Sequence, residues 1–322
     1  MIYEDVPAAL LAYRSVNEEV FRCYEQGRLE DGIRLLTAPR PELLPWRAEL
    51  AYLLACLQGA AGRPGEALGT LRAALAEGGW WDPAVLEGEE DLAEAHGLPG
   101  FPPLLEESAR RWEDGRRTTR EHDLLVRPSV LPARGVLLAL HGAEESERDA
   151  VRAWQPALRA GFAVLAVRSS WRTSPRYRTW PRGAHASQAL DEVDAAVAAH
   201  AAETEGLPLY LAGFSAGGRV ALRWALSREP GTVAGVVAVA PAVSVEELPE
   251  IWDVPAPVHL VVGTDDDLLD DVRALAGHLQ GCRLDEVEGA GHEVPAEAVR
   301  RVLDGWTDAT AAGPERAAAA RP

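Results

Sequence analysis

The sequence predicts an all-α region followed by an α/β domain with a mostly parallel, doubly wound sheet. Up to about residue 115, apolar residues recur at helical spacing and no convincing strand alternation is found. From residue 121, short apolar runs alternate with helical stretches. Strands that alternate with helices form parallel sheets covered by helices. We therefore predict a helical domain at 1–118, an α/β domain at 119–308 and a disordered tail at 309–322.

The helical region contains an internal repeat. GRLEDGIRLL begins at Gly27 and GRPGEALGTL begins at Gly62, an offset of 35 residues. In each copy a Gly ends one helix, and a small residue, Gly32 or Ala67, lets the next helix pack closely. Over residues 10 to about 78 this resembles the tetratricopeptide repeat, whose period is about 34 residues, although the Trp and Pro marks of that family are absent. An irregular helical cap without repeat ancestry is the alternative.

The α/β region contains seven strand-like runs, most of them continuously apolar and closed by Gly, Pro or a polar residue. Such runs are typical of strands buried on both faces of a sheet. They are HDLLVRP, GVLLALHG, FAVLAVRSS, LPLYLAGFS, AGVVAVAP, VHLVVGT and RLDEVEG. The helical stretches between and after them cover 149–160, 187–201, 216–228, 269–279 and 296–306.

Composition excludes several classes of protein. The net charge of -18 argues against nucleic-acid binding, which needs a basic surface. The three cysteines are odd in number and far apart, so neither a disulfide framework nor a metal site is expected. No apolar run is long enough to span a membrane, and the N-terminal residues are acidic where a signal peptide is basic. We expect a cytoplasmic protein without cofactor or metal.

The strongest chemical signal is the pentapeptide GFSAG at 213–217. A strand-like run leads directly into it and a helical stretch leads directly out. Such a strand–turn–helix elbow holds a serine in a strained conformation above the sheet, and small residues on either side let the turn close. Ser215 is therefore the predicted nucleophile.

A serine hydroxyl needs a base to accept its proton, and that base needs a carboxylate to orient it. Of the eight histidines, His292 follows a strand, lies in the Gly-rich loop GAGHEVP and comes after Ser215 in the chain. The run VHLVVGTDDD ends in three adjacent acids between the serine and the histidine, and residue order alone leaves the choice open among Asp265, Asp266 and Asp267.

Four motifs in this order (HG, G-x-S-x-G, G-x-x-D and G-x-G-H) resemble those of α/β-hydrolases over residues 121–307. The resemblance implies that the acid is Asp266, three residues beyond Gly263. It also implies an oxyanion hole formed by the backbone amides of Ala216 and of Ala143, which follows the HG motif, with Gly142 or Glu144 as alternatives to Ala143. His141 of that motif is expected to be structural.

The segment after the third strand-like run reverses the acidic balance of the chain. Between Ala150 and Leu190 there is no Asp or Glu, but there are seven Arg. Arg binds carboxylates and phosphates, and ligands bind near the carboxyl ends of parallel strands. An anionic or carrier-linked acyl substrate is therefore one hypothesis, and ion pairing with the acidic helical domain is the other. The candidate substrate-binding residues are Trp171, Arg172, Arg176 and Arg178.

These observations favour a serine hydrolase that cleaves a small carboxylic ester through an acyl-enzyme, and the resemblance is closest to dienelactone hydrolases and carboxylesterases. A thioesterase or a peptidase would use the same residues. A different possibility is a non-catalytic protein that binds a partner through its helical domain. Haloalkane or epoxide chemistry needs an Asp at the elbow and is excluded by Ser215. Only 241–257 lies where many relatives carry a helical lid, which is too short for one.

Overall fold

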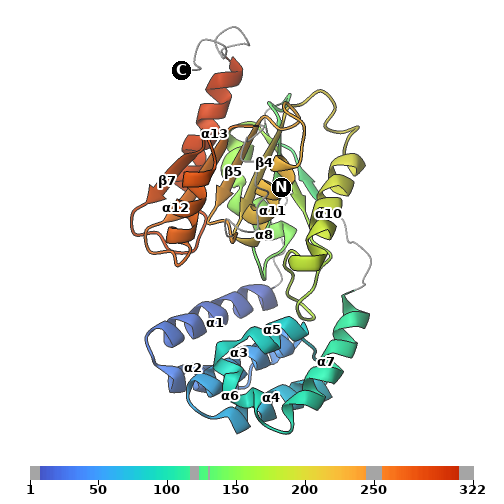
Figure 1. Cartoon of the computed structure of the whole chain (residues 1–322), viewed down its shortest axis with the longest axis vertical. Coiled ribbons are helices and arrows are strands. Elements are labelled where there is room, and N and C mark those ends of the chain that lie inside the picture. Colours follow the sequence, from blue (N-terminus) through green and yellow to red (C-terminus); the bar gives the residue numbers. More distant parts are fainter. Residues whose placement is uncertain (1–7, 117–122, 130, 244–255, 312–322) are drawn as a thin grey trace. The chain divides into compact units, whose positions relative to one another are not determined.

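The computed structural model describes residues 8–116, 123–129, 131–243 and 256–311. The predicted domain junction, the segment in place of a lid and most of the predicted tail lie partly or wholly outside these residues. The chain divides into two compact units. One comprises residues 1–118 with Arg172–Tyr177, and the other comprises 119–171 with 178–322. The first is helical and the second has a seven-stranded sheet, so the predicted fold class is confirmed (Figure 1).

The helical unit is built from seven α-helices and two short 3₁₀ helices within its described residues. In chain order these are α1 Ala8–Glu25, α2 Leu29–Thr37, η1 Pro41–Trp46, α3 Arg47–Ala60, α4 Pro64–Ala76, α5 Pro83–Gly88, η2 Glu90–Leu92, α6 Ala93–His96 and α7 Phe101–Gly115. Two apolar clusters fill its interior, one around Leu71 and Trp81 and one around Val16 and Leu57. None of the described helices is long and apolar enough to cross a membrane.

The internal repeat has a structural counterpart at the ends of α1 and α3. Gly27 and Gly62 both adopt positive φ, 66° and 70°, a conformation that glycine reaches without a Cβ penalty. In both places the following Arg N–H donates to the carbonyl five residues before it, at 2.8 Å. The helix ends therefore repeat at the offset of 35 found in the sequence, and tetratricopeptide ancestry stays a prediction.

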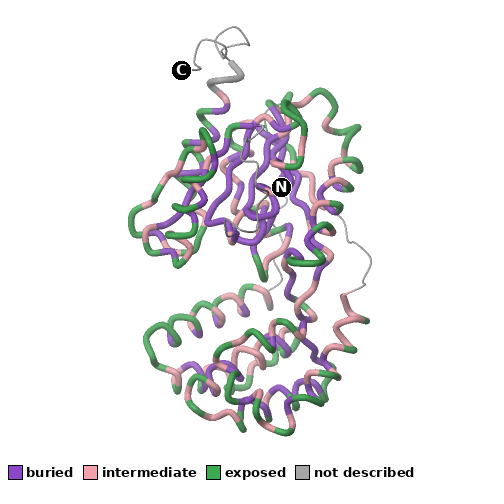
Figure 2. The backbone as a smooth tube through the Cα atoms, in the orientation of Figure 1, coloured by how far each residue is buried: buried purple, intermediate pink, exposed green. Residues whose placement is uncertain are grey.

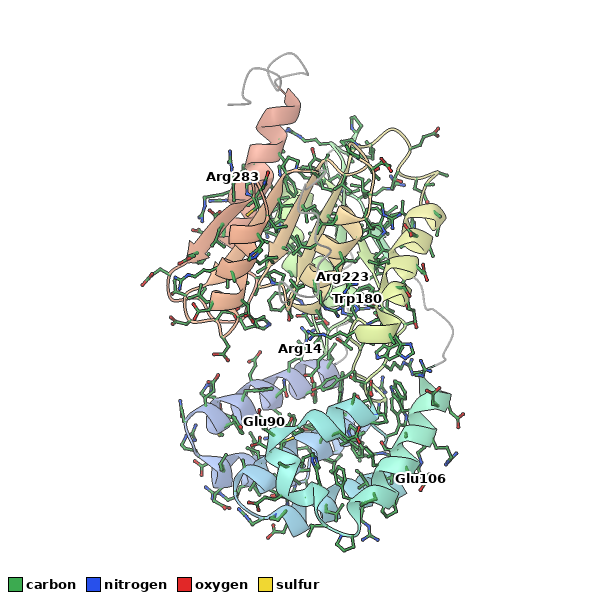
Figure 3. All side chains as sticks on the ribbon, in the orientation of Figure 1. Arg14, Glu90, Glu106, Trp180, Arg223 and Arg283 are labelled. Carbon is green, nitrogen blue, oxygen red and sulfur yellow. The ribbon has the colours of Figure 1, made fainter. Side chains whose placement is uncertain are left out.

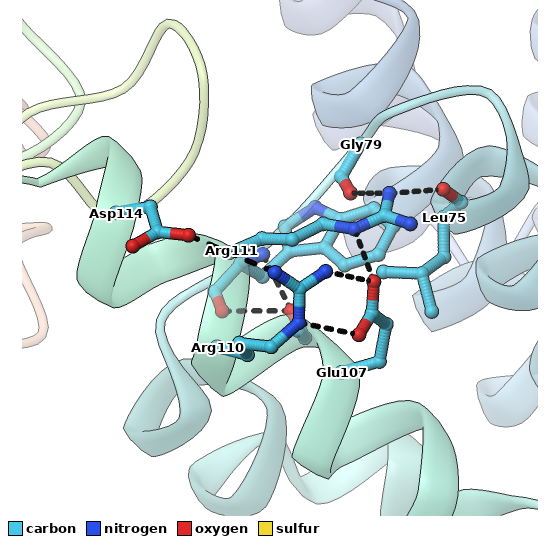
Figure 4. Close-up of polar contacts among 8 residues, drawn as sticks. Leu75, Gly79, Glu107, Arg110, Arg111 and Asp114 are labelled. Carbon is cyan, nitrogen blue, oxygen red and sulfur yellow. Dashed lines mark hydrogen bonds and ion pairs between the residues drawn. The ribbon is translucent and has the colours of Figure 1, made fainter.

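A polar network joins α7 to the end of α4 (Figure 4). Arg111 donates to the carbonyls of Leu75 and Gly79. Its Nε donates to Glu107 at 2.7 Å, and Arg110 donates to the same carboxylate. These two guanidinium groups lower the pKa of Glu107 to about 2. The Arg111 guanidinium thus donates hydrogen bonds to carbonyl groups at and just after the end of α4. Its positive charge also interacts favourably with the negative end of the helix dipole.

The α/β unit contains one sheet with the strand order β1-β3-β2-β4-β5-β6-β7. Only β1 is antiparallel to its neighbour, and the remaining pairs are parallel. The strands are β1 Leu124–Val126, β2 Val136–Leu140, β3 Ala163–Val167, β4 Leu209–Phe214, β5 Gly235–Val239, β6 Val258–Gly263 and β7 Arg283–Val287. Each of the seven strand-like runs in the sequence thus contains one strand of the sheet.

Every residue of β2, β3 and β5 is buried, which requires cover on both faces of the sheet (Figure 2). The cover comes from two sets of helices. In one set α10 Ala186–Ala199 packs against α11 Ala216–Leu226, and in the other α9 Gln155–Arg159 packs against α13 Ala296–Ala311. Two further helices, α8 Glu147–Ala153 and α12 Leu269–His278, contact strands near the two edges.

The helix predicted over 149–160 is two helices, because α8 ends at Ala153 and α9 begins at Gln155. Pro156 stands in the first turn of α9, where its missing N–H costs no hydrogen bond. In one continuous helix that proline would remove a bond from the interior. The break therefore falls where the sequence places the proline.

Candidate active site

Ser215 lies between β4 and α11 in a conformation that few residues other than glycine adopt. Its φ is 50° and its ψ is −117°. Its N–H donates to the Val239 carbonyl at 2.9 Å and its carbonyl accepts the Ala242 N–H at 3.1 Å. These contacts from the neighbouring strand fix the strained backbone. The turn has the geometry of the predicted elbow.

Glycines on both sides of Ser215 make this turn possible. A Cβ on Gly213 would lie 2.3 Å from the carbonyl oxygen of Gly217. A Cβ on Gly217 would lie 2.4 Å from the carbonyl oxygens of both Leu140 and His141. These oxygens belong to the backbone of α11, of the buried strand β2 and of the residue that follows it, so they have no room to move. The spacing G-x-S-x-G is therefore a steric requirement in this protein.

The structure brings His292 to Asp266. Its Nδ1 lies 2.9 Å from Asp266 Oδ2, and the side chain of Asp266 is 1% exposed. The neighbouring Asp265 and Asp267 are both exposed. When Asp266 accepts at Nδ1, the proton of a neutral imidazole ring lies on that nitrogen and the free lone pair lies on Nε2. Among the three adjacent acids, Asp266 is thus the buried one that contacts His292.

The loops that carry Asp266 and His292 are fastened to each other. The Asp265 N–H donates to the Ala290 carbonyl at 3.0 Å, and a Cβ on Gly263 would lie 2.0 Å from that same oxygen. The ring of His292 also lies against that of Phe214, with 4.8 Å between centroids. Phe214 directly precedes Ser215, so His292 packs beside the elbow.

Two parts of the sequence match known family models. Residues 132–254 match a family described as serine aminopeptidase, S33. Residues 12–116 match a family described as A/B hydrolase-like, N-terminal domain. The second unit has the α/β-hydrolase fold and is called the hydrolase domain from here on. No curated protein matches the chain.

Several solved structures resemble the chain. An uncharacterized protein from Bacillus cereus ATCC 10987 is 20% identical, with a TM-score of 0.45 over 92% of this chain and 98% of that one. Esterase PE8 is 20% identical, with a TM-score of 0.48 over 59% and 99%. Est1E from Butyrivibrio proteoclasticus is 17% identical, with a TM-score of 0.42 over 59% and 94%.

The turn after β2 of the hydrolase domain contains the three amides considered for the oxyanion hole. The Gly142 N–H donates to Glu145 Oε2 at 2.6 Å, and the Glu144 N–H donates to the Arg178 carbonyl at 2.6 Å. Within the described residues, the Ala143 N–H donates to no protein acceptor. Neither does the Ala216 N–H, at the first position of α11. The two amides of the predicted oxyanion hole thus share the property of having no acceptor among the described residues.

His141 is built into the hydrolase domain as a neutral side chain. It is 1% exposed, its Nδ1 lies 2.7 Å from the Gly142 carbonyl and its Nε2 accepts the Ser169 N–H at 3.2 Å. Its ring lies 5.1 Å from that of Trp180, which is labelled in Figure 3. Burial lowers the pKa of His141 to about 4. It serves as a scaffold for the turn, as the sequence led us to expect.

Glu145 is a residue that the sequence analysis missed. Its carboxylate binds the Gly142 N–H, and a Cβ on Gly142 would lie 3.1 Å from Oε2 and 2.9 Å from Phe214. Burial raises its pKa, while the Gly142 N–H and the nearby His292 act in the opposite direction. An acid three residues after the HG motif, in a turn with predicted catalytic amides, was the available signal.

The four candidate substrate-binding residues have partners inside the protein. Trp171 is 7% exposed, with its ring 5.1 Å from that of His185. Arg178 is 5% exposed and donates to the Ser169 carbonyl at 2.9 Å. Arg172 and Arg176 belong to the helical unit. Among the described residues, no group of three or more His, Cys, Asp and Glu could hold a metal ion.

Proposed function

We propose that the hydrolase domain cleaves small carboxylic esters through an acyl-enzyme intermediate. The observation that carries this proposal is the arrangement of His292, whose Nδ1 is held by a buried Asp266 and whose ring packs on the residue before Ser215. A histidine held in this way beside a strained serine has the parts of a nucleophile–base–acid set.

In the proposed reaction Ser215 Oγ attacks the ester carbonyl and His292 Nε2 accepts the hydroxyl proton. The amides of Ala143 and Ala216 donate to the oxyanion of the tetrahedral intermediate. Collapse of that intermediate breaks the bond to the alcohol, which takes the proton from His292. Water then attacks the acyl-Ser215 bond by the same steps, releases the carboxylic acid and restores the serine. Asp266 stays ionised and stabilises the imidazolium.

A peptidase is the second candidate, because the family matched by residues 132–254 is described as a serine aminopeptidase. The same residues would cleave an amide, with His292 giving its proton to the leaving amine. A thioester is a third substrate for the same steps. The nature of the leaving group therefore decides between these activities, and the proposed catalytic set serves all of them.

The charge of the acyl group is a separate question from the type of reaction. Arg178 is bonded to the Ser169 carbonyl, and Arg176 donates to the Pro45 carbonyl in the helical unit. Both guanidinium groups thus have backbone partners inside the protein, and neither of these two bonds is an ion pair with an acidic side chain. We accordingly propose neutral acyl esters as the main class, with acidic acyl esters as a comparison.

A fluorophosphonate probe followed by a substrate panel tests the proposal. The wild type is expected to take up the probe at Ser215, and Ser215→Ala is expected to take up none. The panel compares acetyl, longer and acidic acyl esters with matching thioesters and with aminoacyl amides. Faster turnover of amides than of esters would favour the peptidase. A folded wild type that takes no label and cleaves nothing would favour a non-catalytic protein that binds partners through its helices.

A further inference from the structure

Six residues of the chain, Arg172–Tyr177, belong to the helical unit although the residues on both sides belong to the hydrolase domain. The helical unit binds their backbone at several points. The Asp82 N–H donates to the Thr173 carbonyl at 2.7 Å, and Trp112 Nε1 donates to the Arg172 carbonyl at 2.8 Å. Main-chain bonds of this kind are how domains recognise extended peptides.

A buried carboxylate lies at the centre of this recognition. Glu49 of α3 is 1% exposed, and its Oε1 accepts both the Ser174 hydroxyl at 2.5 Å and the Arg176 N–H at 2.7 Å. Ser174 is itself buried and its hydroxyl oxygen accepts the Tyr177 N–H at 3.1 Å. The Glu49 carboxylate therefore accepts two hydrogen bonds from the segment. One of the donors, Ser174, also accepts the Tyr177 N–H and so stabilises the turn of the segment.

Aromatic side chains complete the binding site in the helical unit. Tyr177 is 6% exposed, and its ring centroid lies 6.1 Å from that of Tyr13 and 6.4 Å from that of Trp46. The guanidinium of Arg176 lies 5.8 Å from the Trp46 ring centroid, and its Nε donates to the Pro45 carbonyl at 3.2 Å. The rings around Tyr177 provide apolar contacts, and the Arg176 guanidinium over Trp46 adds a cation–π interaction.

The ends of the segment are closed into a tight loop. The Thr179 N–H donates to the Trp171 carbonyl and the Thr173 N–H donates to the Tyr177 carbonyl, both at 3.1 Å. These cross-loop bonds make the two arms one rigid piece. A displacement of the bound tip would therefore be passed on to the residues at its base.

The base of the loop holds the turn that supplies the proposed oxyanion donor. The Arg178 carbonyl accepts the Glu144 N–H at 2.6 Å, and Trp180 Nε1 donates to the His141 carbonyl at 2.8 Å. Glu144 has a φ of 62°, which a residue other than glycine keeps only when its surroundings hold it there. Ala143 lies between these two anchored residues, so the direction of its N–H depends on them.

We propose that the helical unit is a positioning module: by binding residues 172–177 of its own chain, it holds residues 178–180 in the place that fixes the oxyanion turn at 141–145. The coupling runs along the backbone of one segment and depends on no particular placement of the two units. The expected effect on kcat rests on the proposed ester hydrolysis. The expected effect on the oxyanion turn itself does not.

Hydrogen–deuterium exchange and ester kinetics on the full chain test this proposal. Glu49→Ala removes the acceptor for Ser174 and Arg176. We expect the Glu144 amide to exchange at least about tenfold faster, and kcat to fall about tenfold with little change in KM, because a misdirected oxyanion donor acts on the transition state. The matched control is Glu107→Ala, which also removes one carboxylate from the helical unit and is expected to change neither quantity.

Two further variants keep the test decisive. Glu49→Gln keeps an acceptor oxygen and is expected to restore both the protection of the Glu144 amide and kcat. If Glu49→Ala does not fold, Ser174→Ala, which removes one donor to Glu49, is expected to show a smaller change in the same direction. Unchanged exchange at Glu144 in the folded variants, or an equal change in Glu107→Ala, overturns the proposal. A wild type without hydrolytic activity contradicts the proposed function, and exchange at Glu144 then decides this inference alone.

Discussion

His292 and Asp266 are joined by a single hydrogen bond, from Nδ1 to Oδ2, at 2.9 Å. The second carboxylate oxygen of Asp266 accepts the Leu268 N–H, also at 2.9 Å. The acid is thus fixed by its own loop independently of the histidine, and its orientation does not depend on the protonation of the ring. A substitution of Asp266 that keeps the bond to the Leu268 N–H should therefore change the contact with His292 without unfolding the loop.

Asp266→Asn is therefore expected to abolish most activity without unfolding the protein. The asparagine can still accept the Leu268 N–H, but its amide group would donate to Nδ1 and leave the proton of the imidazole on Nε2, where it blocks the base. We expect kcat to fall by about 10³- to 10⁴-fold, with an unchanged Tm. Asp267→Asn, at an exposed neighbour, is the control. Equal losses in the two variants would show that Asp266 has no special role.

Gly217→Ala is expected to damage both stability and activity. The added Cβ would lie 2.4 Å from two backbone oxygens at the end of β2, so the start of α11 and the Ala216 amide must shift. Overpacking of this kind costs roughly 1–3 kcal/mol in the free energy of unfolding. Gly305→Ala, at an exposed position of α13 with open space around it, is expected to stabilise by roughly 0.5–1 kcal/mol. Urea unfolding measures both, and a stable, active Gly217→Ala would contradict this steric account.

The order of the strands along the chain could be predicted because each is a short apolar run bounded by turn residues. Their order in the sheet could not be predicted from those runs alone, since β1 pairs with β3 and not with β2. The break at Trp154 between α8 and α9 was missed although Pro156 signalled it. Helical periodicity continues on both sides of that break, and the periodicity hid it.

The candidate site was predictable where chemistry depends on local spacing. Ser215 and the glycines around it form one continuous turn, so their roles can be argued from five residues. Glu49 and Ser174 are 125 residues apart, and nothing in either neighbourhood signals the other. Glu145 differs, because its place three residues after the HG motif was a local signal, although its position beside Phe214 was not. Long-range partners of buried carboxylates depend on the whole path of the chain.

Burial of Glu49 gives the free energy of unfolding a specific dependence on pH. Burial raises the pKa of this carboxyl from 4.5, against the opposing effect of its hydrogen bonds. Between the unfolded and folded pKa values the native state binds more protons, so the free energy of unfolding falls as pH rises through this range. Glu49→Gln removes this contribution and keeps an acceptor for Ser174. We expect the variant to gain stability relative to the wild type on passing from pH 4 to 7.

Denaturant unfolding of the wild type and Glu49→Gln at several pH values measures this difference. Glu49→Ala is expected to lose roughly 1–3 kcal/mol at neutral pH, because it leaves buried donors unpaired. A difference between wild type and Glu49→Gln that is constant from pH 4 to 7 would show that Glu49 titrates alike in the folded and unfolded chains.

Glu145 provides the last prediction, which concerns the direction of the oxyanion turn. Its carboxylate engages the Gly142 N–H at 2.6 Å and thereby keeps that amide away from a ligand. In Glu145→Ala the Gly142 amide loses its acceptor and the turn is free to rotate. Removal of an oxyanion donor costs 10²- to 10³-fold in kcat in other enzymes, and a loosened turn is expected to lose part of that, roughly tenfold. Glu145→Gln, whose amide oxygen can accept the same N–H, should keep most of the activity.

The comparison of these two variants separates a positional role from an electrostatic one. If the negative charge of Glu145 were what matters, Glu145→Gln would lose as much as Glu145→Ala, and the hydrogen-bond account would be wrong. Glu205→Ala, which removes an exposed carboxylate of the hydrolase domain outside the oxyanion turn, serves as the control. That variant is expected to keep its activity, since every bond of the oxyanion turn is retained. Measurement of kcat and KM for all three variants at one pH decides between the two accounts.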